Sequence, residues 1–288
     1  MKPNKSIILL ATSIILLLAS CTKDVINVKL PDFEQKLVLA AFISPDLKSN
    51  EISIGYTKYD FGNISAPELP GKVSAVISDG TNEVRIDTML IDSNYFNNRI
   101  RIRDIPISDG KSYKIKVENE KGLTAEASCT IPVRRDFHIE VDTSVLLSSN
   151  PWSGEKYSTT TAKISITDFP GESNYFRLVF SVNGIQFVTP VEDVVISDKG
   201  RDGEKIVLQS ITFYPVTINS TYKTDSAFLR IYLLNTNKAY YDYHKSFYTT
   251  TMGNTGPFTE PSPLYSNVSN GVGIFAAYTI DSLIFRLK

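Results

Sequence analysis

The sequence predicts a mostly β protein: an N-terminal immunoglobulin- or fibronectin-like β-sandwich followed by a second β-rich domain with one short helix. Three observations predict this fold. About seven short segments of alternating apolar and polar residues lie between residues 37 and 131, separated by turn residues. The segment 132–136 then interrupts the alternation, since proline cannot donate to a ladder and charged residues prefer solvent. More alternating segments follow, with one stretch of helical periodicity.

The first domain is predicted at residues 35–133. It opens with a continuous apolar run, Leu37–Ile43, which is typical of a strand covered on both faces. The stretch Asp109–Tyr113 resembles the start of the penultimate strand of such sandwiches. The other apolar rows, each with a period of two, are Ile52, Ile54 and Tyr56; Val73, Ala75 and Ile77; Val84 and Ile86; Ile100 and Ile102; Tyr113, Ile115 and Val117; and Leu123 to Ile131.

The second domain is predicted at residues 134–288, and it is again rich in strands. Asn183-Gly184 fits a two-residue hairpin turn between the strand that ends at Val182 and the strand that begins at Ile185. The remaining strands are predicted around Ala162–Ile166, Phe176–Val182, 206–214, 226–234 and 274–287. The helix is predicted at residues 238–250, because Tyr240, Tyr243, His244 and Phe247 fall on one helical face.

The N-terminus predicts a lipoprotein signal. Two lysines precede an apolar run, Ile7–Leu18, which is shorter than the about 20 residues that a spanning helix needs. The tetrapeptide Leu18-Ala19-Ser20-Cys21 resembles the bacterial lipobox, in which small residues precede a cysteine that is lipidated before cleavage. Residues 1–20 are therefore a predicted signal peptide, and residues 21–34 are a predicted tether that begins at a lipidated Cys21. Acyl chains hold such a protein at a membrane.

Composition narrows the classes of function. The chain has 288 residues with 30 basic and 31 acidic side chains, and this near-zero charge argues against nucleic-acid binding. It has only two cysteines and two histidines, so a zinc site of four such ligands would need all of them to converge. If Cys21 carries lipid, Cys129 has no partner within the chain. The alternation around Cys129 predicts a buried small apolar residue.

No residue is assigned a catalytic, cofactor or metal role from the sequence. The segment Asp198–Glu204 superficially resembles a calcium loop, but Gly200 and Gln209 stand where such a loop needs oxygen ligands, so a polar turn is preferred. His244 is predicted to pack on the helix and His138 to face solvent. The segment Asn270–Gly273 predicts a tight turn before the last strand. A carboxylate pair of the kind that glycosidases use has no positive support.

Three motifs together resemble a known family. They are Leu30-Pro-Asp-Phe-Glu-Gln-Lys-Leu-Val38 after the cysteine; Asp168-Phe-Pro-Gly-Glu-Ser-Asn-Tyr175 in the middle; and Pro257-Phe-Thr-Glu-Pro261, Tyr265-Ser-Asn-Val268 and Asn270-Gly-Val-Gly-Ile-Phe275 near the end. The chain resembles the Bacteroidota outer-membrane lipoprotein family known as domain of unknown function 4249. That resemblance implies a context and no activity: outer-membrane lipoproteins that are often encoded beside TonB-dependent receptors, which are β-barrels.

These observations predict a non-enzymatic outer-membrane lipoprotein, an accessory or ligand-binding subunit of a TonB-dependent receptor system. Its orientation, surface-exposed or periplasmic, is left open. The first expected contact surface is the proline-rich segment near the end, with Phe258, Glu260, Tyr265 and Asn267, because loops on rigid β scaffolds commonly carry recognition. Two alternatives stay open: a surface hydrolase with a carboxylate pair, and a protein for glycan or cell-surface adhesion.

Overall fold

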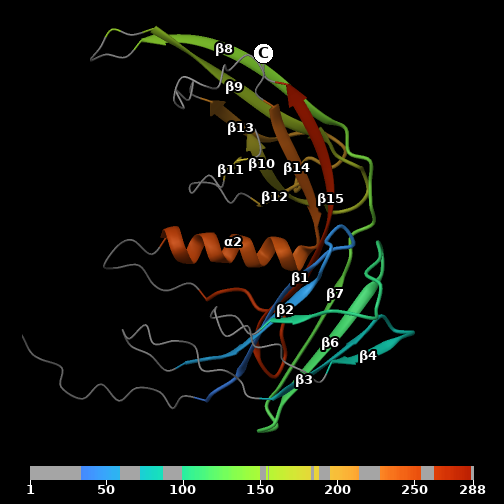
Figure 1. The fold of residues 1–288 in the computed structure, drawn as a ribbon. Coiled ribbons are helices and arrows are strands. Elements are labelled where there is room, and N and C mark those ends of the chain that lie inside the picture. Colours follow the sequence, from blue (N-terminus) through green and yellow to red (C-terminus); the bar gives the residue numbers. More distant parts are fainter. Residues whose placement is uncertain are drawn as a thin grey trace, which may run out of the picture. The chain divides into compact units, whose positions relative to one another are not determined.

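A computed structural model describes residues 34–58, 72–86, 99–149, 154, 156–182, 185–187, 195–213, 228–253 and 263–286. The predicted signal peptide and nearly all of the tether, Cys21 included, lie outside these residues. The elements, drawn in Figure 1, are β1 (Leu37–Ile43), β2 (Glu51–Tyr56), β3 (Val73–Ser78), β4 (Glu83–Ile86), β5 (Arg99–Arg101), β6 (Ser112–Asn119), β7 (Thr124–Thr130), β8 (Ile139–Ser149), β9 (Lys156–Thr167), β10 (Tyr175–Val182), β11 (Ile185–Phe187), β12 (Val195–Ser197), β13 (Lys205–Phe213), β14 (Phe228–Thr236), α2 (Lys238–Gly253) and β15 (Val272–Arg286). Within the described residues, no helix is long and apolar enough to cross a membrane.

The first seven strands form the predicted sandwich. Strands β1, β2 and β5 pair in one sheet, and β4-β3-β6-β7 form the other. Their inward-facing residues share one apolar core, in which Tyr113 is fully buried. The Tyr113 hydroxyl donates to the Pro106 carbonyl oxygen (2.8 Å) and accepts from the Ser108 amide (2.9 Å). This is the tyrosine corner of immunoglobulin-like sandwiches, which confirms the predicted fold class, and the predicted strand with Tyr113, Ile115 and Val117 is confirmed as β6.

Cys129 lies in this first core, as its alternating neighbours predicted. It is 6% exposed and is a free thiol. Burial raises the pKa of the thiol far above its ordinary value, because the thiolate would lose its hydration. The folded state therefore favours the neutral thiol, and stability falls as pH rises above the usual cysteine pKa of about 8.5.

We expect Cys129 to be unreactive toward a thiol reagent in the folded protein. A chain that begins at Thr22 lacks Cys21, so Cys129 is its single thiol. Its reaction with dithionitrobenzoate at pH 8 should be at least about 100-fold slower in buffer than in guanidinium, since only the thiolate reacts. Cys129→Ala gives the blank rate. Equal rates in the two solvents would contradict the burial.

The second sandwich packs the sheet β13-β9-β8 against strands β10, β12, β14 and the end of β15. Its core holds buried residues from both sheets, namely Phe137, Ala162, Ile164, Ile166, Phe176, Phe180, Ile206, Leu208, Leu229, Ile231 and Leu233. Val182 pairs with Ile185 in antiparallel β10 and β11, as the predicted hairpin requires. The turn residues Asn183 and Gly184 lie outside the described residues. His138 faces solvent, as predicted, with a side chain that is 79% exposed.

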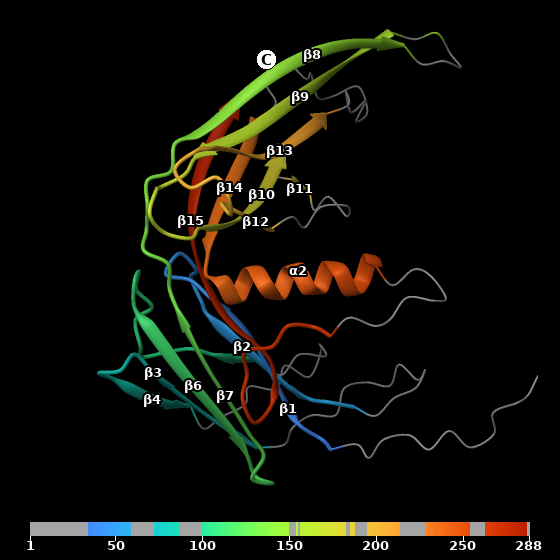
Figure 2. The same cartoon turned by 180° about the vertical axis from the view of Figure 1, so that it is seen from behind.

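Strand β15 belongs to both sandwiches. Its first part, Val272–Ala277, pairs in parallel with β1, and its second part, Tyr278–Arg286, pairs antiparallel with β14. One eight-stranded sheet therefore runs through both halves, and Figure 2 shows β15 passing from β1 to β14. Phe275 and Ala277 enter the first core, whereas Leu283 and Phe285 pack against the second. The domain boundary between residues 133 and 134 stays a prediction. Strand β15, which belongs to the second predicted domain, pairs with β1 of the first.

Helix α2 covers the opposite face of the same sheet. Tyr240 packs with Ile274 and Ala276 of β15, and the rings of Phe42 and Tyr240 lie 5.2 Å apart. This explains why residues 274–277 are all buried: the strand is covered on both faces. The predicted run Leu37–Ile43 is fully buried on one face only. On its other face, Ala40 and Phe42 are half-buried and pack against the cluster under the helix. The helix starts as predicted and ends three residues later.

The N-terminus of α2 is capped by Asn237. Its side-chain oxygen accepts from the Tyr240 amide (3.0 Å), as an N-cap residue does. His244 packs on the helix as predicted, with its ring centroid 4.4 Å from that of Tyr240. Phe247, the last residue of the predicted apolar face, is 45% exposed.

Candidate functional site

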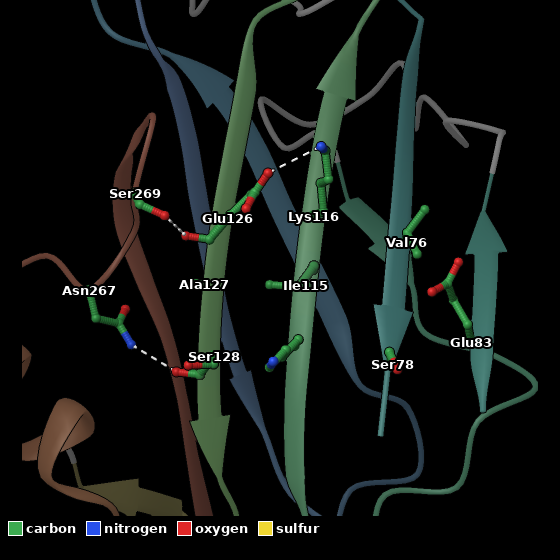
Figure 3. Close-up of a pocket in the computed structure, with 11 residues that line it drawn as sticks. Val76, Ser78, Glu83, Ile115, Lys116, Glu126, Ala127, Ser128, Asn267 and Ser269 are labelled. Atoms are coloured by element: carbon green, nitrogen blue, oxygen red, sulfur yellow. Dashed lines mark hydrogen bonds and ion pairs between the residues drawn. The ribbon is translucent and has the colours of Figure 1, made fainter. Parts of the chain in front are cut away.

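A shallow pocket of about 610 Å³ lies on the outer face of the four-stranded sheet of the first sandwich. Alternation along the strands produces this face, because Tyr113, Ile115 and Val117 point into the core and Lys114 and Lys116 point outward. Figure 3 shows these strands beside the segment that holds Asn267 and Ser269. The pocket is lined by Val76, Ser78, Glu83, Lys114, Ile115, Lys116, Glu126, Ala127, Ser128, Asn267 and Ser269.

The register of the strands arranges the polar lining in two rows. In the first row, Lys116 stands opposite Glu126, and their side chains form an ion pair of 3.2 Å. Both side chains are about half exposed, so the pair contributes only about 0.2–1 kcal/mol. In the second row, Lys114 stands between Ser78 and Ser128. Within the described part of the chain Lys114 has no ion pair, so its ammonium group is available to an acceptor on a ligand.

The segment before β15 closes one side of this pocket. Ser269 exchanges two backbone hydrogen bonds with Glu126 of β7, at 2.8 and 2.9 Å. The Asn267 amide donates to the Phe275 carbonyl (2.8 Å), and its oxygen accepts from the Phe275 N–H (2.9 Å). The bonds between Ser269 and Glu126 cover part of the edge of β7, which would otherwise present unpaired backbone groups. The pocket therefore has a fixed wall from residues 267–269.

The structure places two of the four predicted contact residues. Asn267 lines the pocket, as Figure 3 shows. Tyr265 lies beside helix α2, where its backbone N–H donates to the Ser246 hydroxyl (2.8 Å) and its side chain packs with the residues under the helix. Phe258 and Glu260 lie outside the described residues. A contact surface formed by all four residues therefore stays a prediction.

Sequence reasoning missed the lysines of the pocket. The alternation at Ser112–Asn119 already placed Lys114 and Lys116 on one outward face. However, every solvent-facing strand of a sandwich shows the same alternation, and only the pairing register brings Glu126 and Ser269 beside them. The sequence contained no signal that distinguished this face from the others.

A second polar group lies in the second sandwich. Carboxylate oxygens of Asp168, Asp198 and Asp202 all lie within 4.8 Å of one another. Burial, together with the negative charges of Asp198 and Asp202, raises the pKa of Asp168 above its ordinary value. The two carboxyl groups of a glycosidase stand about 5–9.5 Å apart, leaving room for a sugar or a water. These three carboxylates are closer than that, which is a poor match to a hydrolytic pair.

The fold and the pocket define a β-sandwich protein whose first module is of the immunoglobulin or fibronectin class and carries an open, polar face. The chain belongs to the family described as domain of unknown function (DUF4249), whose model matches residues 23–284. This confirms the family that the sequence motifs indicated.

Two further comparisons add little. Among solved structures, the FN1–FN3 domains of chicken CNTN1 match with a TM-score of 0.25 and 12% identity, over 87% of this chain and 69% of that chain. No curated protein matches the sequence.

Proposed function

We propose that this protein is a lipid-anchored, non-enzymatic subunit of the outer membrane that serves a TonB-dependent receptor system as an accessory or ligand-binding component. Two features support the membrane context. The tetrapeptide that ends at Cys21 resembles a lipobox, and the chain belongs to the family whose resemblance first suggested this setting. The pocket of the first sandwich supports a binding role, since its lysines, hydroxyls and amides are groups that hold a polar ligand.

The observation that carries the proposal is an apolar surface near the end of β8. Val145, Leu146 and Leu147 are 61%, 65% and 82% exposed. Successive side chains of a strand point to opposite faces, so this part of β8 is apolar on both faces. Strand β13 pairs with β9 only as far as Thr160, whereas Leu146 and Leu147 stand opposite Thr159 and Ser158. Figure 1 shows this end of the β8–β9 hairpin beyond β13.

A protein partner would give these side chains the burial that the sandwich does not. Exposed neighbouring apolar residues mark interaction sites, and each buried Å² contributes about 25 cal/mol. A receptor barrel at the same membrane is the partner that we propose. Under this proposal the hairpin provides the docking contact, while the pocket on the first sandwich is left open for a ligand.

The test is co-purification from native outer membranes after cross-linking. We expect the lipidated wild-type protein to recover a barrel receptor, and Leu146→Glu/Leu147→Glu to recover at least about tenfold less of it, because two charges would enter an apolar contact. Ile284→Glu is the matched control, since Ile284 is a 57% exposed apolar residue on β15. Recovery of no barrel by the wild type, or equal recovery by the double variant, would contradict the proposal.

A further inference from the structure

Two turns of the second sandwich bring three aspartates together. Asp168 stands in the turn between β9 and β10, and Asp198 and Asp202 stand in the turn between β12 and β13. Backbone hydrogen bonds join the turns: the Asp168 N–H donates to the Glu204 carbonyl (3.0 Å), and the Asp198 N–H donates to the Asn174 carbonyl (3.2 Å). The three carboxylates are thereby held within 4.8 Å of one another.

Among the described residues, one buried carboxylate oxygen of this cluster has no hydrogen-bond partner. Asp168 is 4% exposed, and its Oδ2 accepts from the Gly203 N–H at 3.1 Å. Its Oδ1 is buried, and no group in the described part of the chain hydrogen-bonds to it. Asp198, 6% exposed, is almost as buried. A buried carboxylate oxygen without a partner is costly, and a second and third carboxylate nearby make it costlier still.

We infer that Asp168, Asp198 and Asp202 form a binding site for a Ca²⁺ ion. Ca²⁺ binds carboxylate oxygens at about 2.3–2.6 Å, so two ligands on opposite sides of one ion stand at most about 5.2 Å apart. The observed separations fit that limit. Mg²⁺ keeps more of its water and is usually bound by only one or two carboxylates, so three carboxylates in one place favour Ca²⁺.

The spacing of the aspartates in the sequence does not match a continuous calcium loop, so the sequence alone did not predict this site. In a continuous calcium loop, Asp198 would need partners at the positions that Gly200 and Gln209 occupy. In the structure the further carboxylate comes from a different turn. Asp168 follows β9, whereas Asp198 follows β12. With only three protein carboxylates, the expected affinity is that of extracellular modules, with a Kd of roughly 0.1–1 mM.

Calorimetric titration of the metal-free full chain with CaCl₂ tests the inference. We expect one ion per chain, and weaker or no binding of MgCl₂. Asp202→Asn and Asp168→Asn should each raise the Kd for Ca²⁺ at least about tenfold, since each removes a charged ligand. Asp202 is exposed, so its variant is expected to fold. Glu204→Gln removes a carboxylate from the same turn but outside the cluster, and should bind Ca²⁺ as the wild type does.

A second measurement separates the metal site from a purely structural role. In buffer with a chelator, Asp168→Asn should melt no lower than the wild type, because it removes a buried charge that faces two others. With Ca²⁺, the wild-type melting temperature should rise and that of Asp168→Asn should not. The inference fails if the wild type shows no saturable Ca²⁺ binding up to about 10 mM, or if both Asn variants bind as the wild type does.

Discussion

Gly273→Ala is expected to destabilise the fold severely. A Cβ atom at this position would lie 1.9 Å from the Leu39 carbonyl oxygen, and Gly273 has a φ of +127°, which residues with a side chain rarely adopt. The clash is with the backbone of β1, where Leu39 is paired directly with Gly273, so neither side can move without breaking the sheet. Positive φ costs about 1–3 kcal/mol, and the overlap adds at least about as much again. A small domain has only about 5–15 kcal/mol of stability in total.

Urea unfolding followed by circular dichroism measures this effect. Gly55→Ala is the matched control: Gly55 lies in β2, on the other side of β1, and a Cβ there would have no neighbour within 4 Å. We expect the Gly55 variant to stay within about 1 kcal/mol of the wild type. A Gly273→Ala protein with the wild-type midpoint would show that β1 and β15 do not approach as closely as described.

Cys21→Ser is expected to release the protein from the membrane. The apolar run before Cys21 is shorter than a spanning helix, so the acyl chains on the cysteine would supply the anchor. Each buried CH₂ contributes about 0.8 kcal/mol, and two or more chains hold a protein stably where one does not. Serine has no thiol to lipidate. The variant should therefore lose the anchor entirely rather than weaken it.

Fractionation with a carbonate wash and mass spectrometry measures this release. The wild type should stay in the membrane pellet with a mass increased by its acyl chains, whereas the serine variant should not. Cys129→Ala is the matched control, because it removes the other cysteine, which is buried in the first core, and should leave membrane attachment unchanged. A serine variant that remains in the washed pellet would overturn the lipid anchor.

Individual strands could be predicted from the sequence, because the alternation that indicates a strand involves only residues that are neighbours in the chain. The period of two at Tyr113, Ile115 and Val117 predicts a half-buried strand, and the structure buries these side chains. The segment Ile139–Ser149 gave no comparable signal, since Val145, Leu146 and Leu147 interrupt the alternation. At these three residues β8 extends beyond the core of the second sandwich. Both of its faces are exposed there, and this accounts for the irregular pattern.

Long-range pairings could not be read from the sequence. Leu39 and Gly273 are adjacent in the sheet although more than 200 residues separate them. No local pattern reports such a pairing, and parallel strands have no connecting turn to mark it. The same limit applies to both candidate sites. Ser269 and Glu126 are 143 residues apart in the sequence, and Asp168 and Asp198 stand in different turns.

The shared strand β15 sets the order in which the molecule can be completed. During synthesis from the N-terminus, β1 emerges long before residues 272–277, so the edge that it offers to them stays unpaired until they have been made. Contacts of such sequence separation slow folding, and an open strand edge invites pairing with another chain. The sheet of the first sandwich thus cannot close until β15 is present, and a chain truncated before Val272 would carry that open edge permanently.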